Sequence, residues 1–293
     1  MTPAISILLT MAPGREDNLN GCLYALSQQD SQDFEIIIAD DGSEAGQMIA
    51  NQFSHLPIQY LWRANDRCVS RSRNLAAAQA KANVFLFLDC DVLLNPHAVS
   101  NYINHFQIKR DQAIAGYMGC TLQYVSESVL LPGRMVNFGD RRIHKISRQG
   151  LELLHRALIY PYRYCWSANL ATSKNVHEQV GGFDERYICW GGEDEQFGLD
   201  LIRKGFQLNF AIDTWGEHQV HPRNTSFHEQ IHTNKSFKRS LWGPVNYRPQ
   251  IYSSTQAVQK LIKAYFEHYL PNSPKLSELT LWQIQYPDAI LTI

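Results

Sequence analysis

The chain lacks a long hydrophobic run and any excess of charge of one sign. Its most apolar stretch, residues 82–88, stops at Asp89, well short of the ~20 apolar residues that a membrane-spanning helix needs. The formal net charge is -1, whereas domains that bind nucleic acid are usually strongly basic. We therefore expect a soluble protein that binds no nucleic acid.

The cysteines do not come in the closely spaced pairs that hold zinc or build a disulfide framework. Six are scattered along the chain, at positions 22, 68, 90, 120, 165 and 189. The first residues also lack the basic start and long apolar run of a secretory signal peptide. Scattered cysteines are typical of proteins in a reducing compartment. We therefore expect the protein in the cytoplasm, with any membrane contact peripheral and at the inner face of the membrane.

The first 110 residues alternate between strand and helix patterns. Short apolar runs predict buried strands at 4–11, 34–41, 58–62 and 84–91. Helical spacing of apolar residues lies between them, at 19–26, 46–53 and 72–82. Asn95 and Pro96 are typical of a helix N-cap and a first helical residue. This order predicts an α/β fold with a mostly parallel central sheet flanked by helices.

The second half of the chain is more mixed. It predicts strands at 113–119, 165–174 and 206–212, and helices at 151–160, 197–205 and 255–270. Residues about 126–150 form a polar, basic stretch, which we expect to face solvent, with contact to an anionic partner or a membrane surface as the alternative. Residues about 222–255 carry few periodic patterns. We expect one compact domain, with a C-terminal loop and helix at 226–293 packed on it.

Two of the predicted strands end in acidic pairs, Asp40-Asp41 and Asp89-Cys90-Asp91. Ligands of open parallel sheets bind beyond the carboxyl ends of the strands. Asp89 and Asp91 project to the same side of an extended segment, and two carboxylates at that spacing suit Mg²⁺ or Mn²⁺. The alternative is that these aspartates only cap the helices that follow.

A second acidic cluster lies in the stretch Trp190–Phe197, "WGGEDEQF". Three adjacent carboxylates repel one another, and the pair of glycines gives up backbone order. Glu193 and Asp194 fall at the start of a predicted helix, where the helix dipole favours carboxylates. A simple helix cap needs neither Trp190 nor two glycines, so the stretch indicates a binding or catalytic site.

The motifs ADDGS, RSRN, LDCD, GGFDE and WGGED occur in this order along the chain. Together they resemble family-2 glycosyltransferases of the GT-A fold. The second part is similar to the galactosyltransferase motif of bacterial chondroitin polymerases and animal β-1,4-galactosyltransferases. The likeness covers residues ~3–225, about three quarters of the chain. It implies a Rossmann-like GT-A domain over 1–225, with a nucleotide-binding half at 1–110 and an acceptor and catalytic half at 111–225.

The resemblance implies a metal-dependent site for a UDP-sugar donor. Asp41 would hydrogen-bond the uracil, with Asp40 more structural. Asp91 would bind Mn²⁺ or Mg²⁺ directly, and Asp89 would hold the ribose or a metal-bound water. The family's metal-binding histidine corresponds to His218, with His221 in reserve. The other implied donor-binding residues are Arg71, Arg73, Asn74 and Asn169. The segment "TMAPGRED" departs from the family's aromatic-Asn pair, which leaves that nucleotide contact open.

The resemblance also implies a carbohydrate acceptor on the WGGED side. Asp194 would be the general base, Glu193 would orient acceptor or donor hydroxyls, and Trp190 would offer a stacking face to a sugar ring. Gly191 and Gly192 would let the backbone approach the sugar closely. Retaining polypeptide N-acetylgalactosaminyltransferases have asparagine where this chain has an aspartate, so an inverting displacement is favoured. A retaining enzyme of that kind and a catalytically silent nucleotide-sugar-binding domain are the alternatives. The donor sugar, the acceptor and the linkage stay open.

Overall fold

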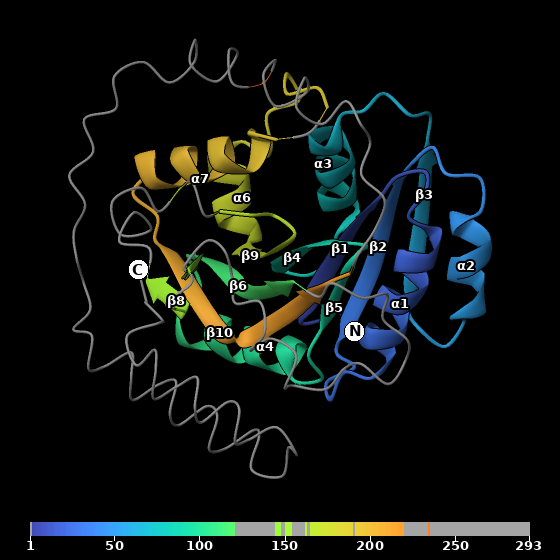
Figure 1. Ribbon diagram of the computed structural model, residues 1–293, viewed down its shortest axis with the longest axis horizontal. Helices are drawn as coiled ribbons and strands as arrows, with labels where there is room; N and C mark the ends of the chain where they lie inside the picture. Colours follow the sequence, from blue (N-terminus) through green and yellow to red (C-terminus); the bar gives the residue numbers. More distant parts are fainter. Residues whose placement is uncertain are drawn as a thin grey trace.

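A central sheet organises the molecule. The computed structural model describes residues 2–120, 144–147, 150–153, 162, 165–189, 191–219 and 234. Over this part of the chain the sheet has the strand order β3-β2-β1-β4-β9-β6-β10-β5 (Figure 1). The bounds are β1 Ile5–Met11, β2 Phe34–Asp41, β3 Ile58–Arg63, β4 Val84–Asp89, β5 Val92–Leu94, β6 Ala113–Cys120, β9 Asn169–Ser173 and β10 Leu208–His218.

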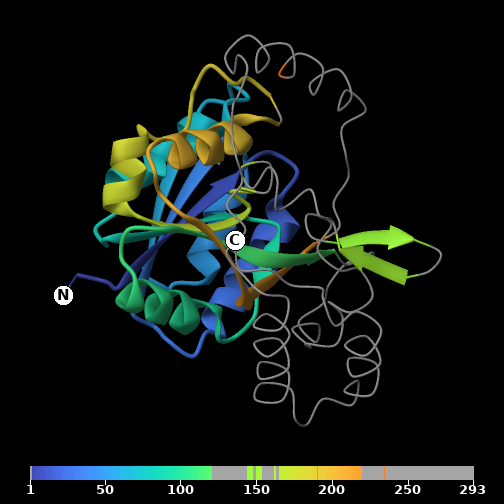
Figure 2. The ribbon, with the colours of Figure 1, turned by 90° about the vertical axis from the view of Figure 1, so that its left-hand side faces the viewer.

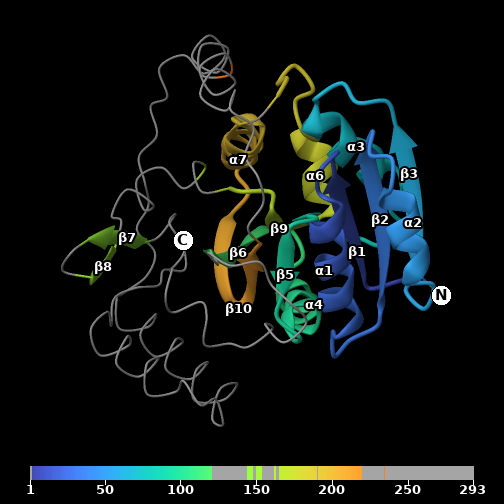
Figure 3. The ribbon, with the colours of Figure 1, turned by 45° about the vertical axis from the view of Figure 1, so that its right-hand side comes forward.

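The sheet is mostly parallel, as expected. Strand β1 pairs in parallel with β2 and β4, β2 with β3, and β10 with β6. Strand β9 runs antiparallel between β4 and β6, and the short β5 runs antiparallel to β10. Figure 3 shows β1, β2 and β3 side by side at one end of this sheet, beside α1 and α2.

Helices cover both faces of the sheet. Their bounds are α1 Glu16–Ser27, α2 Gly46–Gln52, α3 Val69–Gln79, α4 Ala98–Ile108, α6 Lys174–Val180 and α7 Glu193–Arg203. Helices α3, α6 and α7 share one hydrophobic cluster with the sheet, and α1, α2 and α4 share another. Figure 2 shows α7 above the sheet and α4 below it.

Strand β1 lies in the interior of the sheet because most of its residues are apolar. All seven of its side chains are buried, as a nearly continuous apolar run predicts for a strand covered on both faces. Ile7 and Leu9 face the α1 side, and Leu8 faces the α3 side. Each such side chain stabilises the fold by roughly 1.5–3 kcal/mol on burial. The first four predicted strands are confirmed.

Helix α4 begins later than predicted. Its first residue is Ala98, so Asn95 and Pro96 are not its N-cap and first helical residue. The Asn95 side chain instead donates hydrogen bonds to the backbone carbonyls of Trp215 at 2.8 Å and Asp213 at 3.3 Å, and accepts one from the His97 N–H. It therefore fastens the turn before α4 to β10.

Two further elements differ from the expectation. The predicted helix at 151–160 is wrong at its start, because β8 Gly150–Leu153 pairs antiparallel with β7 His144–Ser147. Residues 154–160 lie outside the described residues. Helix α6 was not predicted, although Ser173 Oγ accepts from the Val176 N–H at its start and Gly181 ends it with φ +94°.

Some expectations fall outside the described residues: the basic stretch from 126 to 143, the segment after 219 apart from Asn234, and the helix at 255–270. The division into 1–225 and 226–293 therefore stays a prediction. Within the described part, none of the helices is long and apolar enough to cross a membrane.

Gly198, on α7, has no room for a side chain. A Cβ there would lie 2.5 Å from Cys165 Cβ and 3.0 Å from the Tyr162 carbonyl oxygen. Alanine normally stabilises a helix by about 1 kcal/mol over glycine. We expect Gly198→Ala to lower the free energy of unfolding instead, by about 1–3 kcal/mol, in urea titrations.

Gly21, on α1, is the matched control. A Cβ there would approach the end of the Gln219 side chain, which can shift more easily than backbone. Gly21→Ala should therefore cost less than Gly198→Ala. A Gly198→Ala protein as stable as the native chain would contradict the tight packing of α7 on Tyr162 and Cys165.

Candidate active site

The two acidic pairs meet at one edge of the sheet, on either side of β1. In the strand register Met11 lies opposite Asp40 and Thr10 lies opposite Asp89. The carboxyl ends of β2 and β4 are therefore separated by the width of one strand. This is the arrangement that the sequence predicts for a ligand site in an open parallel sheet.

Asp40 builds the turn after β2. It is fully buried and accepts hydrogen bonds from the Ser43 N–H at 2.8 Å, from Ser43 Oγ at 2.7 Å and from the Tyr60 hydroxyl. Burial, and then the bond to Asp40, raise the pKa of Tyr60. Gly42 has φ +90°, and a Cβ there would lie 2.9 Å from the Asn65 backbone N. Asp40 thus acts within the fold and shapes the turn that carries Asp41.

Asp41 begins a chain of ion pairs along the rim of the sheet. Its carboxylate binds the Arg63 guanidinium and accepts from the Asp66 N–H at 3.3 Å. Asp66 also binds Arg63 and Arg71, and Arg71 Nε reaches Glu185 Oε2 at 3.1 Å. The rim therefore joins the end of β2 to the GGFDE turn. Arg63 was not among the predicted site residues, because its partners Asp41 and Asp66 lie outside its own strand and form no motif with it.

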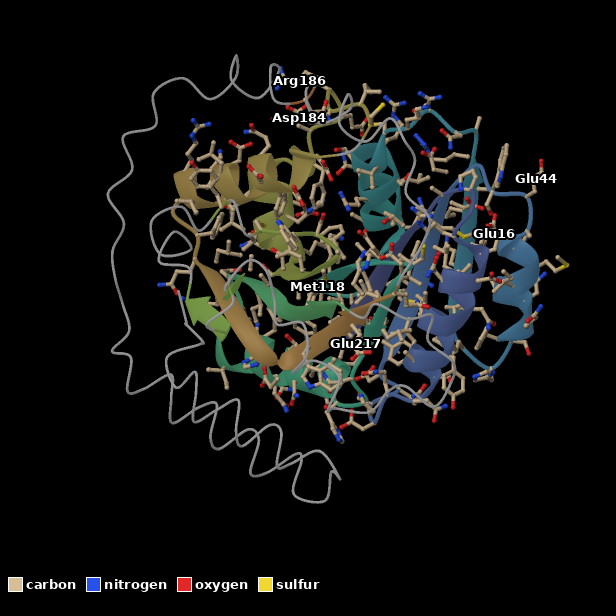
Figure 4. The ribbon with its side chains drawn as sticks, in the orientation of Figure 1. Glu16, Glu44, Met118, Asp184, Arg186 and Glu217 are labelled. Carbon is tan, nitrogen blue, oxygen red and sulfur yellow. The ribbon has the colours of Figure 1, made fainter. Side chains whose placement is uncertain are left out.

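The pairing of β5 with β10 brings His218 beside Asp91. His218 lies opposite Val92, and the Gln219 N–H donates to the Asp91 carbonyl at 2.7 Å. Gly216 permits this close approach, because a Cβ there would lie 2.8 Å from Val92 Cγ1. Figure 4 labels Glu217, which precedes His218 on the arm of β10 that pairs with β5.

The Asp91 and His218 side chains form a two-residue donor set. His218 Nε2 lies 3.5 Å from Asp91 Oδ1, and Arg15 Nε lies 4.0 Å from Asp91 Oδ2. A carboxylate and an imidazole suit Mn²⁺. Over the described residues no group of three or more His, Cys, Asp or Glu side chains could hold a metal. These two side chains could supply two of the ligands of a divalent metal ion. His221 lies outside the described residues.

Glu193 and Asp194 of the WGGED motif are the first two residues of α7, and Gly192 is its N-cap. Gly191 and Gly192 have φ values of +96° and +108°, which favour glycine. Glu193 is buried, whereas Asp194 is half-buried and its Oδ1 accepts from the Glu195 N–H at 2.8 Å. The helix N-terminus favours both carboxylates as anions. Trp190 lies outside the described residues.

Arg73 joins the two acidic clusters. Its guanidinium donates from Nη1 to Glu193 Oε1 at 3.0 Å and from Nη2 to Asp89 Oδ1 at 3.2 Å, and the side chain is buried. Burial alone would lower the pKa of Arg73, but Asp89, Glu193 and Asp194 more than offset it and raise the pKa above its usual range. Arg73 is therefore engaged inside the protein, whereas Arg71 is half exposed on the rim.

Asn74 fastens the GGFDE turn to α3. Its Nδ2 donates to the Phe183 carbonyl at 2.8 Å and to Glu185 Oε1 at 3.0 Å, and its Oδ1 accepts from the Phe183 N–H at 2.9 Å. These bonds satisfy both backbone polar groups of Phe183. The bond from Asn74 is the main cause that lowers the pKa of Glu185, followed by Arg71.

Asn169 lies in the core rather than at an accessible surface. It is fully buried, its Oδ1 accepts from the Tyr102 hydroxyl at 2.8 Å, and its Nδ2 donates to the Thr214 carbonyl at 3.0 Å. Its amide thus links α4, β9 and β10. A residue so engaged is not available to a donor sugar, and the site proposed below omits it.

His177, which the sequence analysis missed, lies beneath the GGFDE turn. The rings of Phe85, Phe87, Phe183 and Phe197 surround it at centroid distances of 5.6, 5.3, 6.1 and 5.9 Å. Burial lowers its pKa to about 4, so the imidazole is neutral near pH 7. At the outer edge of the same segment, Asp184 pairs with Arg186 at 2.7 Å, and both are labelled in Figure 4.

Comparison with solved structures defines the class of fold. The chain superposes on the Staphylococcus aureus TarS crystal structure with a TM-score of 0.56 and 14% identity, over 99% of this chain and 53% of that one. The mannosyltransferase PcManGT from Pyrobaculum calidifontis, solved with GDP-Man and Mn²⁺, gives a TM-score of 0.56 and 13% identity, over 99% and 77%. The fold is that of GT-A glycosyltransferases.

Comparison of sequences identifies the family. Residues 9–178 match the model of glycosyl transferase family 2, and residues 151–222 match a model described as the N-terminal domain of galactosyltransferase. The chain belongs to glycosyl transferase family 2. The resemblance predicted from the motifs is therefore confirmed.

Curated relatives are longer than the matched region. The chain is 25% identical to validoxylamine A glucosyltransferase of Streptomyces hygroscopicus subsp. limoneus over 75% of its own length and 52% of the relative. It is 30% identical to the chondroitin synthase of Escherichia coli over 67% of its own length and 32% of that protein. The chain thus spans about half or less of these relatives, and their whole activities are not assigned to it.

The lowered pKa of His177 predicts a loss of stability in acid. Its folded pKa of about 4 lies below the unfolded value of 6.5, so the unfolded chain takes up the proton first as the pH falls. This contribution is fully present above pH 6.5 and is lost down to about pH 4, by roughly 3 kcal/mol. Urea unfolding of the native chain and of His177→Phe at several pH values measures it. Parallel pH profiles for the two proteins would contradict the prediction.

Proposed function

We propose that this chain is a metal-dependent, inverting glycosyltransferase that moves a sugar from a UDP-sugar to a hydroxyl of a carbohydrate acceptor. One observation carries the proposal. Asp89, at the donor edge of the sheet, and Glu193, at the acceptor end of α7, share the guanidinium of Arg73. Two acidic motifs far apart in sequence thus belong to one site, as transfer between two bound sugars requires.

Asp91 and His218 are the proposed holders of Mn²⁺ or Mg²⁺, because their facing oxygen and nitrogen lie 3.5 Å apart. When bound, the metal would supply positive charge that offsets the negative charge on departing UDP. Asp89 is less suited as a direct ligand, since its Oδ1 accepts from Thr10 Oγ1 at 3.0 Å as well as from Arg73. We assign Asp89 to the ribose or to a metal-bound water.

Asp41 is the proposed partner of the uracil. One of its oxygens is held by Arg63 and by the Asp66 N–H, which leaves the carboxylate in a fixed orientation at the rim. The fold alone does not determine which nucleobase the donor carries, because proteins of this fold were solved with UDP, UDP-GlcNAc and GDP-Man. The resemblance of this DDGS motif to that of family-2 glycosyltransferases supports uracil as the nucleobase and UDP as the nucleotide.

Asp194 is the proposed general base. The acceptor oxygen forms a bond to C1 of the donor sugar as the bond from C1 to UDP breaks, and the acceptor proton passes to the Asp194 carboxylate. Asp194 is half-buried, so an acceptor can reach it, and it lies at the helix N-terminus, where the helix dipole is favourable for a carboxylate. Glu193 Oε2 has no hydrogen-bond partner among the described residues and would accept one from a sugar hydroxyl.

The acceptor surface would be completed by Trp190, Gly191 and Gly192. A Cβ at Gly191 would meet no atom of the described residues within 4 Å, so that part of the structure leaves room for a ligand beside this backbone. Stacking of a sugar ring on Trp190 stays a proposal from the resemblance. Residues 1–225 are the proposed catalytic unit, in the cytoplasm.

Release of UDP from a panel of UDP-sugars, with Mn²⁺ and with a chelator, tests the proposed function. We expect metal-dependent release with one donor, and a loss of at least ~100-fold in kcat for Asp194→Asn, because an amide cannot take the proton. Glu195→Gln is the matched control, since it removes the adjacent carboxylate. It should keep most of the activity.

The product anomer separates the alternatives. Inversion at C1 supports the displacement with Asp194 as base, whereas retention would favour the N-acetylgalactosaminyltransferase-like alternative. UDP binding without release from any donor or acceptor tried would favour a silent sugar-nucleotide-binding domain. Absence of both binding and release would refute the proposal.

A further inference from the structure

Arg73 is the residue through which donor and acceptor motifs touch, and its contacts on the two sides are unequal. On the donor side, Asp89 accepts from Thr10 Oγ1 at 3.0 Å as well as from Arg73 at 3.2 Å. On the acceptor side, Arg73 is the one ionic or hydrogen-bonding partner of the Glu193 side chain within the described residues, at 3.0 Å. Loss of Arg73 would therefore leave Asp89 anchored and Glu193 unanchored.

The position of Arg73 is itself fixed by the neighbouring motif. Its guanidinium carbon lies 5.2 Å from the centroid of the Phe183 ring, within reach of a cation–π contact. Phe183 stacks on Phe197 of α7 with centroids 4.5 Å apart, and Asn74 holds the Phe183 backbone through both its N–H and its carbonyl. Two consecutive residues of α3 thus hold the GGFDE turn and the start of α7 together.

Arg73 offers the diphosphate little accessible surface, because even its Nε, which has no hydrogen-bond partner among the described residues, is buried. Arg73 is 4% exposed, and each of its two terminal nitrogens already binds a carboxylate. Moving the guanidinium would leave Glu193 charged, buried and unpaired, an arrangement that proteins avoid. The resemblance to the family's RN segment implied that Arg73 contacts the nucleotide. Its burial and its bonds to Asp89 and Glu193 favour a different role.

We propose that Arg73 is a positioning residue for the acceptor-side carboxylates rather than a ligand of the nucleotide. It fixes Glu193 against the donor edge of the sheet, so that the next residue, Asp194, faces the sugar that is transferred. This inference rests on the proposed function. It predicts that Arg73 affects turnover more than donor binding.

Arg73→Met tests the inference through separate measurements of kcat and of UDP binding in the presence of Mn²⁺. We expect kcat to fall about 100-fold, because a small displacement of catalytic groups costs about that much. The Kd for UDP should rise less than about 3-fold, since Asp89 keeps its bond to Thr10. Arg203→Met, which breaks an exposed pair with Asp200 on α7, is the control and should leave both values unchanged.

Arg73→Lys keeps the positive charge but cannot bind Glu193 and Asp89 through two separate nitrogens. It serves as a second variant in case Arg73→Met does not fold. We expect it to fold and to lose about 10-fold or more in kcat, with UDP binding retained. In a double-mutant cycle, Glu193→Gln should reduce kcat much less in the Arg73→Met background than in the native chain.

The outcomes separate this inference from the proposed function. A large loss of UDP affinity with unchanged kcat, in either Arg73 variant, would overturn the positioning role and restore direct contact with the nucleotide. Additive effects of Arg73→Met and Glu193→Gln would also overturn it. If the native chain turned over no donor, the proposed function would fail, and this inference with it.

Discussion

The buried guanidinium of Arg73 is the interaction on which the arrangement of the site depends. It lies between the half-buried carboxylate of Asp89 at the end of β4 and the buried carboxylate of Glu193 on α7, and charges buried in this way are tolerated only when they are paired. The pairing joins helices packed on the sheet to the carboxyl edge of the strands. Without it, the two acidic motifs would belong to the same fold but not to one site.

A second constraint comes from the register of the sheet. The three residues of β5 pair with the end of β10 after an irregularity between Ala211 and Gly216. That irregularity directs Gly216–His218 along β5 and brings an imidazole from late in the chain to the carboxylate that follows β4. In the proposed site, parallel strands bring the aspartates together and one antiparallel pair adds a histidine.

The first four strands, most of the helices of the first half and the acidic motifs could be predicted from the sequence, because apolar periodicity and turn residues are local features. The partners of individual side chains could not. Arg71 and Arg73 belong to one motif, yet one lies on the rim and the other is buried, which follows from the helix face they occupy. Asn169 likewise matched a motif by type, while its burial between α4 and β10 depends on contacts from distant segments.

Binding of UDP to the native chain, with and without Mn²⁺, is the most direct test of the claim that these motifs form one metal-dependent donor site. We expect tight binding only with the metal, and loss of that metal dependence in His218→Ala, which removes the imidazole facing Asp91. His105→Ala is the control, since His105 pairs with Asp213 instead. Metal-dependent binding that survives in His218→Ala, or binding to the native chain that does not change with the metal, would contradict a metal-dependent donor site at Asp91 and His218.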